Sequence, residues 1–227
     1  MVFLFHQNVV YLHTTEKIRT TFKQNTFIMK RIITTSLTVA FLALLSAMPV
    51  MAQNTGKSNS RVAYIRKAYQ DAVANANKSA DNKITVTQRE KYEGGANVTT
   101  MEFFYLVDVV EGPDIPFYKL NFLRRTCKGQ DNRYEEFLYD PKDESLLFYF
   151  ISFEHEKGVK CETRYYVGAN DDGTGMQVTK YTDTKTGQDV TSRYSNYIGM
   201  PWDEGFLMRF AHDMQEGFNH ITLRGWD

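Results

Sequence analysis

The sequence predicts an α+β domain: an N-terminal helix, an antiparallel β-meander of about six or seven strands forming one curved sheet, and a C-terminal helix. Three observations predict this class. Apolar residues first recur at three- and four-residue steps, then short β-rich runs alternate with turn residues, and a second helical stripe follows them.

The first helix is predicted to start near Arg61, with Ser58 or Ser60 as its cap. Its apolar face consists of Val62, Ile65, Tyr69, Val73 and Ala76. The helix is expected to end in the polar stretch NANKSADN, after which the period of the apolar residues changes to two.

Seven β-rich runs follow, and they are separated by segments rich in glycine, proline, asparagine and aspartate. The runs span residues 83–92, 97–110, 117–127, 133–139, 145–154, 159–167 and 176–183. Tight turns between successive strands are typical of an antiparallel meander.

The segment ANDDGTG, before the last run, has the acids and glycines of an ion-binding loop but lacks its pattern. The glutamate of a calcium-binding EF-hand and the lysine of a phosphate loop are both missing. We therefore interpret it as a hairpin turn in which Gly173 and Gly175 are free to adopt a positive φ.

The second helix is predicted after Pro201, which suits a first helical turn, and Asp203 and Glu204 suit the positive end of a helix. Phe206, Phe210 and Met214 give it an apolar stripe, with Leu207 and Phe218 beside them.

The start of the chain predicts export. Lys30 and Arg31 precede the apolar run LTVAFLALLSAMPV, which is too short to span a membrane and ends before the small residue Ala52. We interpret residues 29–52 as a signal peptide, residues 1–28 as an upstream extension from a start codon placed too early, and residues 53–227 as a single mature α+β domain. The protein is then expected to be periplasmic or secreted, with no transmembrane segment after cleavage.

The charge of the mature chain argues against some partners. Cleavage after Ala52 shortens the chain of 227 residues to 175 and removes five of its 27 basic and one of its 27 acidic residues, which leaves 22 against 26 and a formal charge of −4. A slightly acidic chain with no basic block is not expected to bind nucleic acid.

Both cysteines, Cys127 and Cys161, lie in the mature chain, and an oxidising compartment favours a disulfide between them. Their strands, however, are three positions apart if the strands pair in sequence order, or about 14 Å at about 4.8 Å per strand. A disulfide needs Cα atoms within about 7 Å. Either the sheet brings them together or they stay reduced.

The run Leu146 to Phe153, LLFYFISF, has apolar or aromatic residues on both faces, whereas a strand with one solvated face should alternate. We expect it to be covered on both sides, by helices, by a partner subunit or by a ligand. Consecutive aromatic residues on a strand point to opposite faces, so Phe148, Tyr149, Phe150, Tyr165 and Tyr166 are the candidate binding residues.

The candidate metal ligands are His212, Glu216 and His220, which are spaced i, i+4, i+8 on the predicted second helix. Two imidazoles and a carboxylate form the ligand set of many zinc sites. The alternative is a solvated polar face, because His212 lies two residues, or about 200°, from Phe210.

One segment resembles a known group of proteins. EEFLYDPKDESLLFYF, followed by a turn and CETRYYV, is similar to a pattern in uncharacterised exported proteins of Bacteroidota-type bacteria. The resemblance covers about a third of the mature chain. It implies a small helix-plus-meander envelope domain and transfers no catalytic residues.

The sequence contains no GxSxG, HExxH, CxxC or SxxK motif and no glycine-rich dinucleotide loop, so we assign no catalytic residue and no cofactor. We expect an exported envelope protein that acts as a non-enzymatic binding or accessory module. Its partner would be another envelope protein, a peptide, a glycan or a small apolar ligand. The alternatives are a hydrolase of the cone-shaped helix-and-sheet type with a polar pocket, and a homodimer formed by sheet-face packing.

Overall fold

A computed structural model describes residues 56–78, 81–109, 116–129, 132–194 and 203–223. Residues 54–227 form one compact unit. The predicted upstream extension and signal peptide lie outside the described residues and stay predictions. The elements are α2 (Gly56–Lys78), β1 (Lys83–Tyr92), β2 (Gly95–Val109), β3 (Pro116–Lys128), β4 (Arg133–Tyr139), β5 (Leu146–Glu156), β6 (Val159–Tyr166), β7 (Met176–Asp183), the 3₁₀ turn η1 (Thr191–Tyr194) and α3 (Glu204–Leu223).

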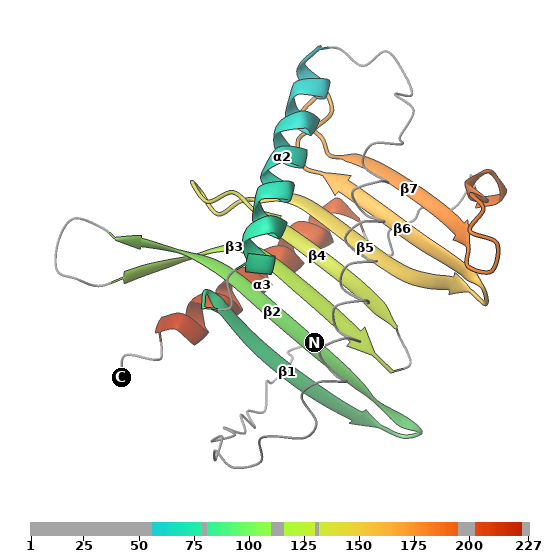
Figure 1. Ribbon diagram of the computed structural model, residues 1–227, viewed down its shortest axis with the longest axis horizontal. Helices are drawn as coiled ribbons and strands as arrows, with labels where there is room; N and C mark the ends of the chain where they lie inside the picture. The colour runs from blue at the N-terminus through green and yellow to red at the C-terminus, as the bar shows by residue number, and fades with distance from the viewer. Residues whose placement is uncertain (1–55, 79–80, 110–115, 130–131, 195–202, 224–227) are drawn as a thin grey trace. The chain divides into compact units, whose positions relative to one another are not determined.

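The predicted α+β class and the antiparallel meander are confirmed. All seven strands form one sheet in the order β1 to β7, and each strand pairs antiparallel with the next along the chain. The sheet is open, with α2 in front of it and α3 behind it (Figure 1). The tight turns between the strands account for this order, because each leaves room only for the adjacent antiparallel partner.

Helix α2 packs against the middle of the sheet through most of the face that the sequence predicts. Val62, Ile65 and Tyr69 are buried as predicted, whereas the predicted Val73 and Ala76 are half-buried and Ala72 is buried instead. The ring of Tyr69 lies 5.8 Å from that of Phe122 on β3 and 5.2 Å from that of Phe148 on β5. The helix begins at Gly56, five residues before the predicted start, so Ser58 and Ser60 lie within its first turns and do not cap it.

Helix α3 covers the opposite face, with a stripe displaced from the predicted one. Leu207, Ala211 and Phe218 are buried, whereas Phe206 is 42% exposed. The hydroxyl of Tyr139 on β4 donates to the carbonyl oxygen of Ala211 at 2.9 Å. Neighbouring helical positions differ by about 100°, so a helix that directs Leu207 toward the sheet directs Phe206 away from it. The prediction of Phe206 as a core residue was wrong.

Strand β5 is buried on both sides, as its apolar pattern predicts. Every residue from Leu146 to Ile151 is buried. Phe148 faces Tyr69 of α2, while Tyr149 belongs to the core cluster that includes Leu207 of α3. The two helices therefore contribute to its cover on opposite faces.

The segment ANDDGTG is the connection between β6 and β7, as predicted. The amide of Asn170 donates to the carbonyl oxygen of Thr174 at 3.0 Å, and Gly173 adopts a φ of +85°. Gly175 serves a different purpose from the predicted one. A Cβ atom there would lie 1.9 Å from the Tyr165 hydroxyl oxygen, so close approach of the ring, and no positive φ, requires glycine.

Candidate functional site

The aromatic residues predicted to bind a ligand lie in the interior. The exposed fractions of Phe148, Tyr149, Phe150, Tyr165 and Tyr166 are between 0% and 4%. The rings of Phe148 and Tyr166 lie 5.1 Å apart, and that of Tyr149 lies 4.9 Å from that of Phe137. These rings fill the core on both sides of the sheet, so the structure presents none of them to a ligand in solvent.

The predicted metal ligands do not form a site. His212, Glu216 and His220 are all exposed on α3. Their spacing separates the two histidines by about 12 Å along the helix axis, at about 1.5 Å per residue, so one ion cannot bind both. In the part of the chain that the structure describes, no three His, Cys, Asp or Glu side chains are grouped to hold a metal ion.

Cys127 and Cys161 are buried and free. They lie on β3 and β6, three positions apart in the sheet, and the sheet does not bring them together. Of the two alternatives that the sequence left open, the structure contains the reduced pair. Burial raises the pKa of the Cys161 thiol, which disfavours the thiolate that a nucleophile needs.

Two buried glutamates on β4, which sequence reasoning missed, organise the polar interior. Glu136 points toward α2, where it accepts a hydrogen bond of 2.5 Å from the Tyr69 hydroxyl and a second from Tyr134, and Arg124 Nε lies 3.6 Å from its carboxylate. Burial, followed by the charge of Glu136, raises the pKa of both tyrosines well above its ordinary value. This network fastens α2 to the sheet.

Glu135 has an equivalent network on the α3 side. It is fully buried, accepts a hydrogen bond of 2.9 Å from the Tyr149 hydroxyl and forms an ion pair with Arg125. Arg133 Nε lies 3.8 Å from the same carboxylate. Burial and then the Glu135 charge raise the pKa of Tyr149. Because these partners surround each carboxylate, we interpret both networks as structural supports.

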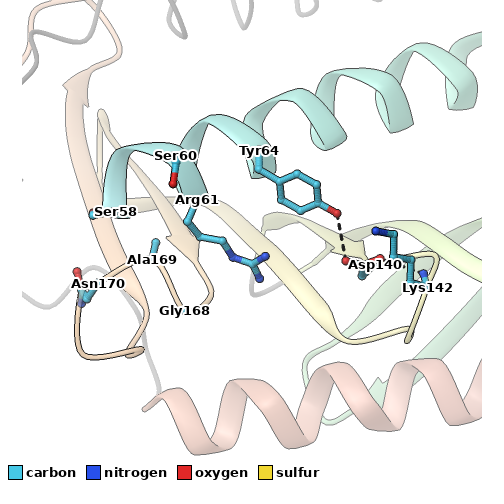
Figure 2. Close-up of a pocket in the computed structure, with 9 residues that line it drawn as sticks. All are labelled: Ser58, Ser60, Arg61, Tyr64, Asp140, Lys142, Gly168, Ala169 and Asn170. Carbon is cyan, nitrogen blue, oxygen red and sulfur yellow. Dashed lines mark hydrogen bonds between the residues drawn. The ribbon is translucent and has the colours of Figure 1, made fainter. Parts of the chain in front are cut away.

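A pocket of about 500 Å³ lies at the N-terminal end of α2. It is open to solvent and lies between the helix and two loops, one joining β4 to β5 and the other joining β6 to β7 (Figure 2). Its lining residues are Ser58, Ser60, Arg61, Tyr64, Asp140, Lys142, Gly168, Ala169 and Asn170.

Hydrogen bonds hold the wall of the pocket in place. The carboxylate of Asp140, which is buried, accepts the Tyr64 hydroxyl at 3.2 Å and the backbone amide of Lys142 at 2.9 Å. Partial burial and then the charge of Asp140 raise the pKa of Tyr64, so its hydroxyl stays protonated and donates. Figure 2 shows the Tyr64 ring extending from α2 toward Asp140.

Arg61 and Lys142 give the pocket its positive charge. Arg61 Nε donates to the carbonyl oxygen of Val167 at 3.4 Å, and its guanidinium lies 5.6 Å from the centre of the Tyr64 ring. Among the described residues no carboxylate forms an ion pair with Arg61 or Lys142. Asp140 is the acidic residue among the described lining residues, and Asp143, in the same loop between β4 and β5, acts electrostatically on Arg61 from outside the lining.

The N-terminal end of α2 adds to the positive electrostatic potential of the pocket. The first turn of α2 contains no acidic residue, so its positive end is not neutralised by the helix's own side chains. A cationic wall at the positive end of a helix attracts anions.

Sequence reasoning named Ser58, Ser60 and Arg61 only as a helix start and missed the pocket. One signal was present. In a meander the turns that follow even-numbered strands lie at the same end of the sheet, which would have placed the turns at Asp140 and Gly168 near each other. Nothing in the sequence showed that the start of α2 would lie above them.

Comparisons with protein-family models, with curated proteins and with solved structures gave no match. None of the helices in the described part of the chain combines the length and the apolar character that a membrane span requires.

Proposed function

We propose that this protein is an exported, non-enzymatic binding module that holds a small anionic ligand in the pocket at the start of α2. One observation carries the proposal: Arg61 and Lys142 line an open pocket in which no described carboxylate pairs with either cation. The volume of about 500 Å³ lies in the range of small-molecule sites. The pocket replaces the sheet aromatics as the proposed site.

The lining residues favour binding over catalysis. The described residues that line the pocket include no histidine and no cysteine, and the two titratable acids among them, Asp140 and Tyr64, already form a hydrogen bond with each other. A hydrolase would need a nucleophile or an activated water beside a free base. The hydrolase alternative therefore has less support than the binding module.

The binding test uses calorimetric titration of the purified protein with inorganic phosphate and with acetate at low ionic strength. Arg61→Gln and Lys142→Gln each remove one cation from the pocket. We expect each change to weaken anion binding about 10- to 100-fold, since hydrogen bonds to a charged group contribute about 1.5–3 kcal/mol.

Lys67→Gln is the matched control. Lys67 lies on the same helix, outside the pocket, and forms an exposed ion pair of 2.9 Å with Asp71. The Lys67→Gln variant changes the net charge by the same amount as the other two variants and should leave the anion affinity within about twofold of that of the unaltered protein. Equal losses in all three variants would show diffuse attraction and would overturn the proposal.

Export has its own test. Expression in a bacterium followed by mass spectrometry of the periplasmic fraction should give a chain that begins at Gln53. A cytoplasmic protein of unreduced length would contradict the export proposal. The homodimer stays a prediction, which a sizing column with light scattering tests directly.

A further inference from the structure

We propose that the ligand of this pocket is an acidic sugar, a pyranose ring that carries a carboxylate. This inference rests on the proposed function, because it specifies the anion that the same site binds. Three features of the lining carry it: a guanidinium with one edge free, hydrogen-bond acceptors beside the donors, and an exposed aromatic ring at the helix.

The cationic group suits a carboxylate. Arg61 Nε donates to the Val167 carbonyl oxygen, and no described residue accepts a hydrogen bond from the two terminal nitrogens, whose planar fork matches the two oxygens of a carboxylate. Figure 2 shows the guanidinium pointing from α2 into the space between the two loops. The carboxylate of Asp140 on the same wall disfavours a dianion more than a monoanion.

The pocket also presents hydrogen-bond acceptors, to which a sugar ring with several hydroxyl groups can donate at more positions than an inorganic anion can. The side-chain amide nitrogen of Asn170, Nδ2, donates to Thr174 Oγ1 at 2.9 Å and to the carbonyl oxygen of Gly175 at 2.8 Å. These bonds fix the orientation of the amide and leave its Oδ1 as an acceptor. Asp140 likewise retains lone pairs beyond its two bonds. A ligand with hydroxyl donors as well as a carboxylate complements both groups.

Tyr64 supplies the surface for a sugar ring. It is 43% exposed although its hydroxyl is held by Asp140, so an apolar ring is kept at the pocket without being buried in the core. Such a ring, apolar in its body and polar at its tip, can pack against the C–H face of a pyranose while neighbouring groups bind the hydroxyls. Inorganic phosphate and acetate have no equivalent face.

The experiment titrates the purified protein with D-glucuronate, D-glucose and inorganic phosphate, and follows binding by calorimetry. We expect glucuronate to bind at least about tenfold more tightly than either of the other two, which differ from it by lacking the carboxylate or the ring. Arg61→Gln and Tyr64→Ala should each weaken glucuronate binding about tenfold or more. Circular dichroism and the thermal midpoint establish that each variant is folded.

Tyr64→Phe separates the ring from its hydrogen bond. It retains the aromatic face but removes the bond to Asp140 that holds the ring at the pocket, so it should weaken glucuronate binding less than Tyr64→Ala does. Lys67→Gln again serves as the control for charge alone. A loss in Tyr64→Phe as large as in Tyr64→Ala would overturn the role of the ring.

The outcomes separate the two proposals. If phosphate binds as tightly as glucuronate and both depend on Arg61, the anion-binding function stands and the acidic-sugar inference is overturned. If neither anion binds, or if binding does not depend on Arg61, both are overturned. A preference for glucuronate that requires both Arg61 and Tyr64 supports both.

Discussion

Raising the pH above about 10 should unfold this protein, because its buried tyrosines cannot ionise in place. Burial is the first cause that raises the pKa of Tyr69, Tyr134, Tyr139 and Tyr149, and the buried glutamates raise three of them further. In the unfolded chain all four titrate near the ordinary pKa of about 10. Above that pH the unfolded state binds fewer protons than the folded state, so stability falls as pH rises.

The size of the effect follows from the four groups. At pH 11 each tyrosine that ionises only on unfolding stabilises the unfolded state by about 1.4 kcal/mol, so the four together contribute about 6 kcal/mol. At pH 10 the same groups contribute about 1.6 kcal/mol, and at pH 8 almost nothing. The free energy of unfolding of a domain is typically about 5–15 kcal/mol, so the loss at pH 11 is comparable to the total stability of a domain at the lower end of that range.

The assay is urea unfolding followed by circular dichroism at several values between about pH 8 and pH 11, together with tyrosinate absorbance. Tyr139→Phe removes one of the four groups and should reduce the alkaline slope by about a quarter. Tyr92→Phe is the control, since Tyr92 is exposed on β1. If all tyrosines titrate reversibly near pH 10 while the circular dichroism stays native, the buried networks do not exist as described.

Three further predictions concern the packed interior. Gly175→Ala should lower the free energy of unfolding by about 1–3 kcal/mol, because the new methyl group overlaps Tyr165. Gly217→Ala, which has open space beside it in α3, should raise that free energy by about 0.5–1 kcal/mol, and thermal unfolding measures both changes. Leu207→Ala should cost about 2–5 kcal/mol and Phe206→Ala less than about 1 kcal/mol, and equal losses in urea unfolding would contradict the stripe described for α3. Both cysteines should react with a thiol reagent only after unfolding, and a mass two hydrogens lower would reveal a disulfide instead.

The sheet could be predicted because its determinants are local. Each turn is too short for anything except an antiparallel neighbour, so seven runs in sequence give seven strands in the same order. The apolar pattern of Leu146 to Phe153 likewise indicated burial on both faces, because an alternating strand would have left one face polar. In both cases a few consecutive residues are enough to predict the structural feature.

The rotation of α3 could not be predicted, because its sequence offers two apolar stripes. Phe206 and Phe210 form one, and Leu207, Ala211 and Phe218 form the other. The shape of the sheet decides between them. The Tyr139 hydroxyl donates to the carbonyl oxygen of Ala211, and the ring centres of Phe218 and Phe103 lie 5.9 Å apart. These contacts direct the second stripe toward the sheet. Such contacts join residues distant in sequence and leave no local pattern.

The pocket was hidden for the same reason and has a consequence that can be measured. Its walls come from three segments far apart in sequence, and each segment alone resembles a helix start or a turn. Because Asp140 and Asn170 are already fixed by hydrogen bonds, the site is formed before a ligand arrives. A ligand that binds only this folded arrangement must stabilise it by mass action, by about 2.7 kcal/mol at a concentration 100 times its Kd.

For a domain of this size that stabilisation should raise Tm by roughly 5–10 °C, because 1 kcal/mol corresponds to about 2–4 °C. Differential scanning calorimetry with and without the tightest anion measures it, and Arg61→Gln should abolish the rise at the same concentration. An anion attracted by scattered lysines and arginines would bind the unfolded chain as well and leave Tm unchanged. A constant Tm at saturating anion would therefore contradict a preformed pocket even if calorimetric titration detected binding.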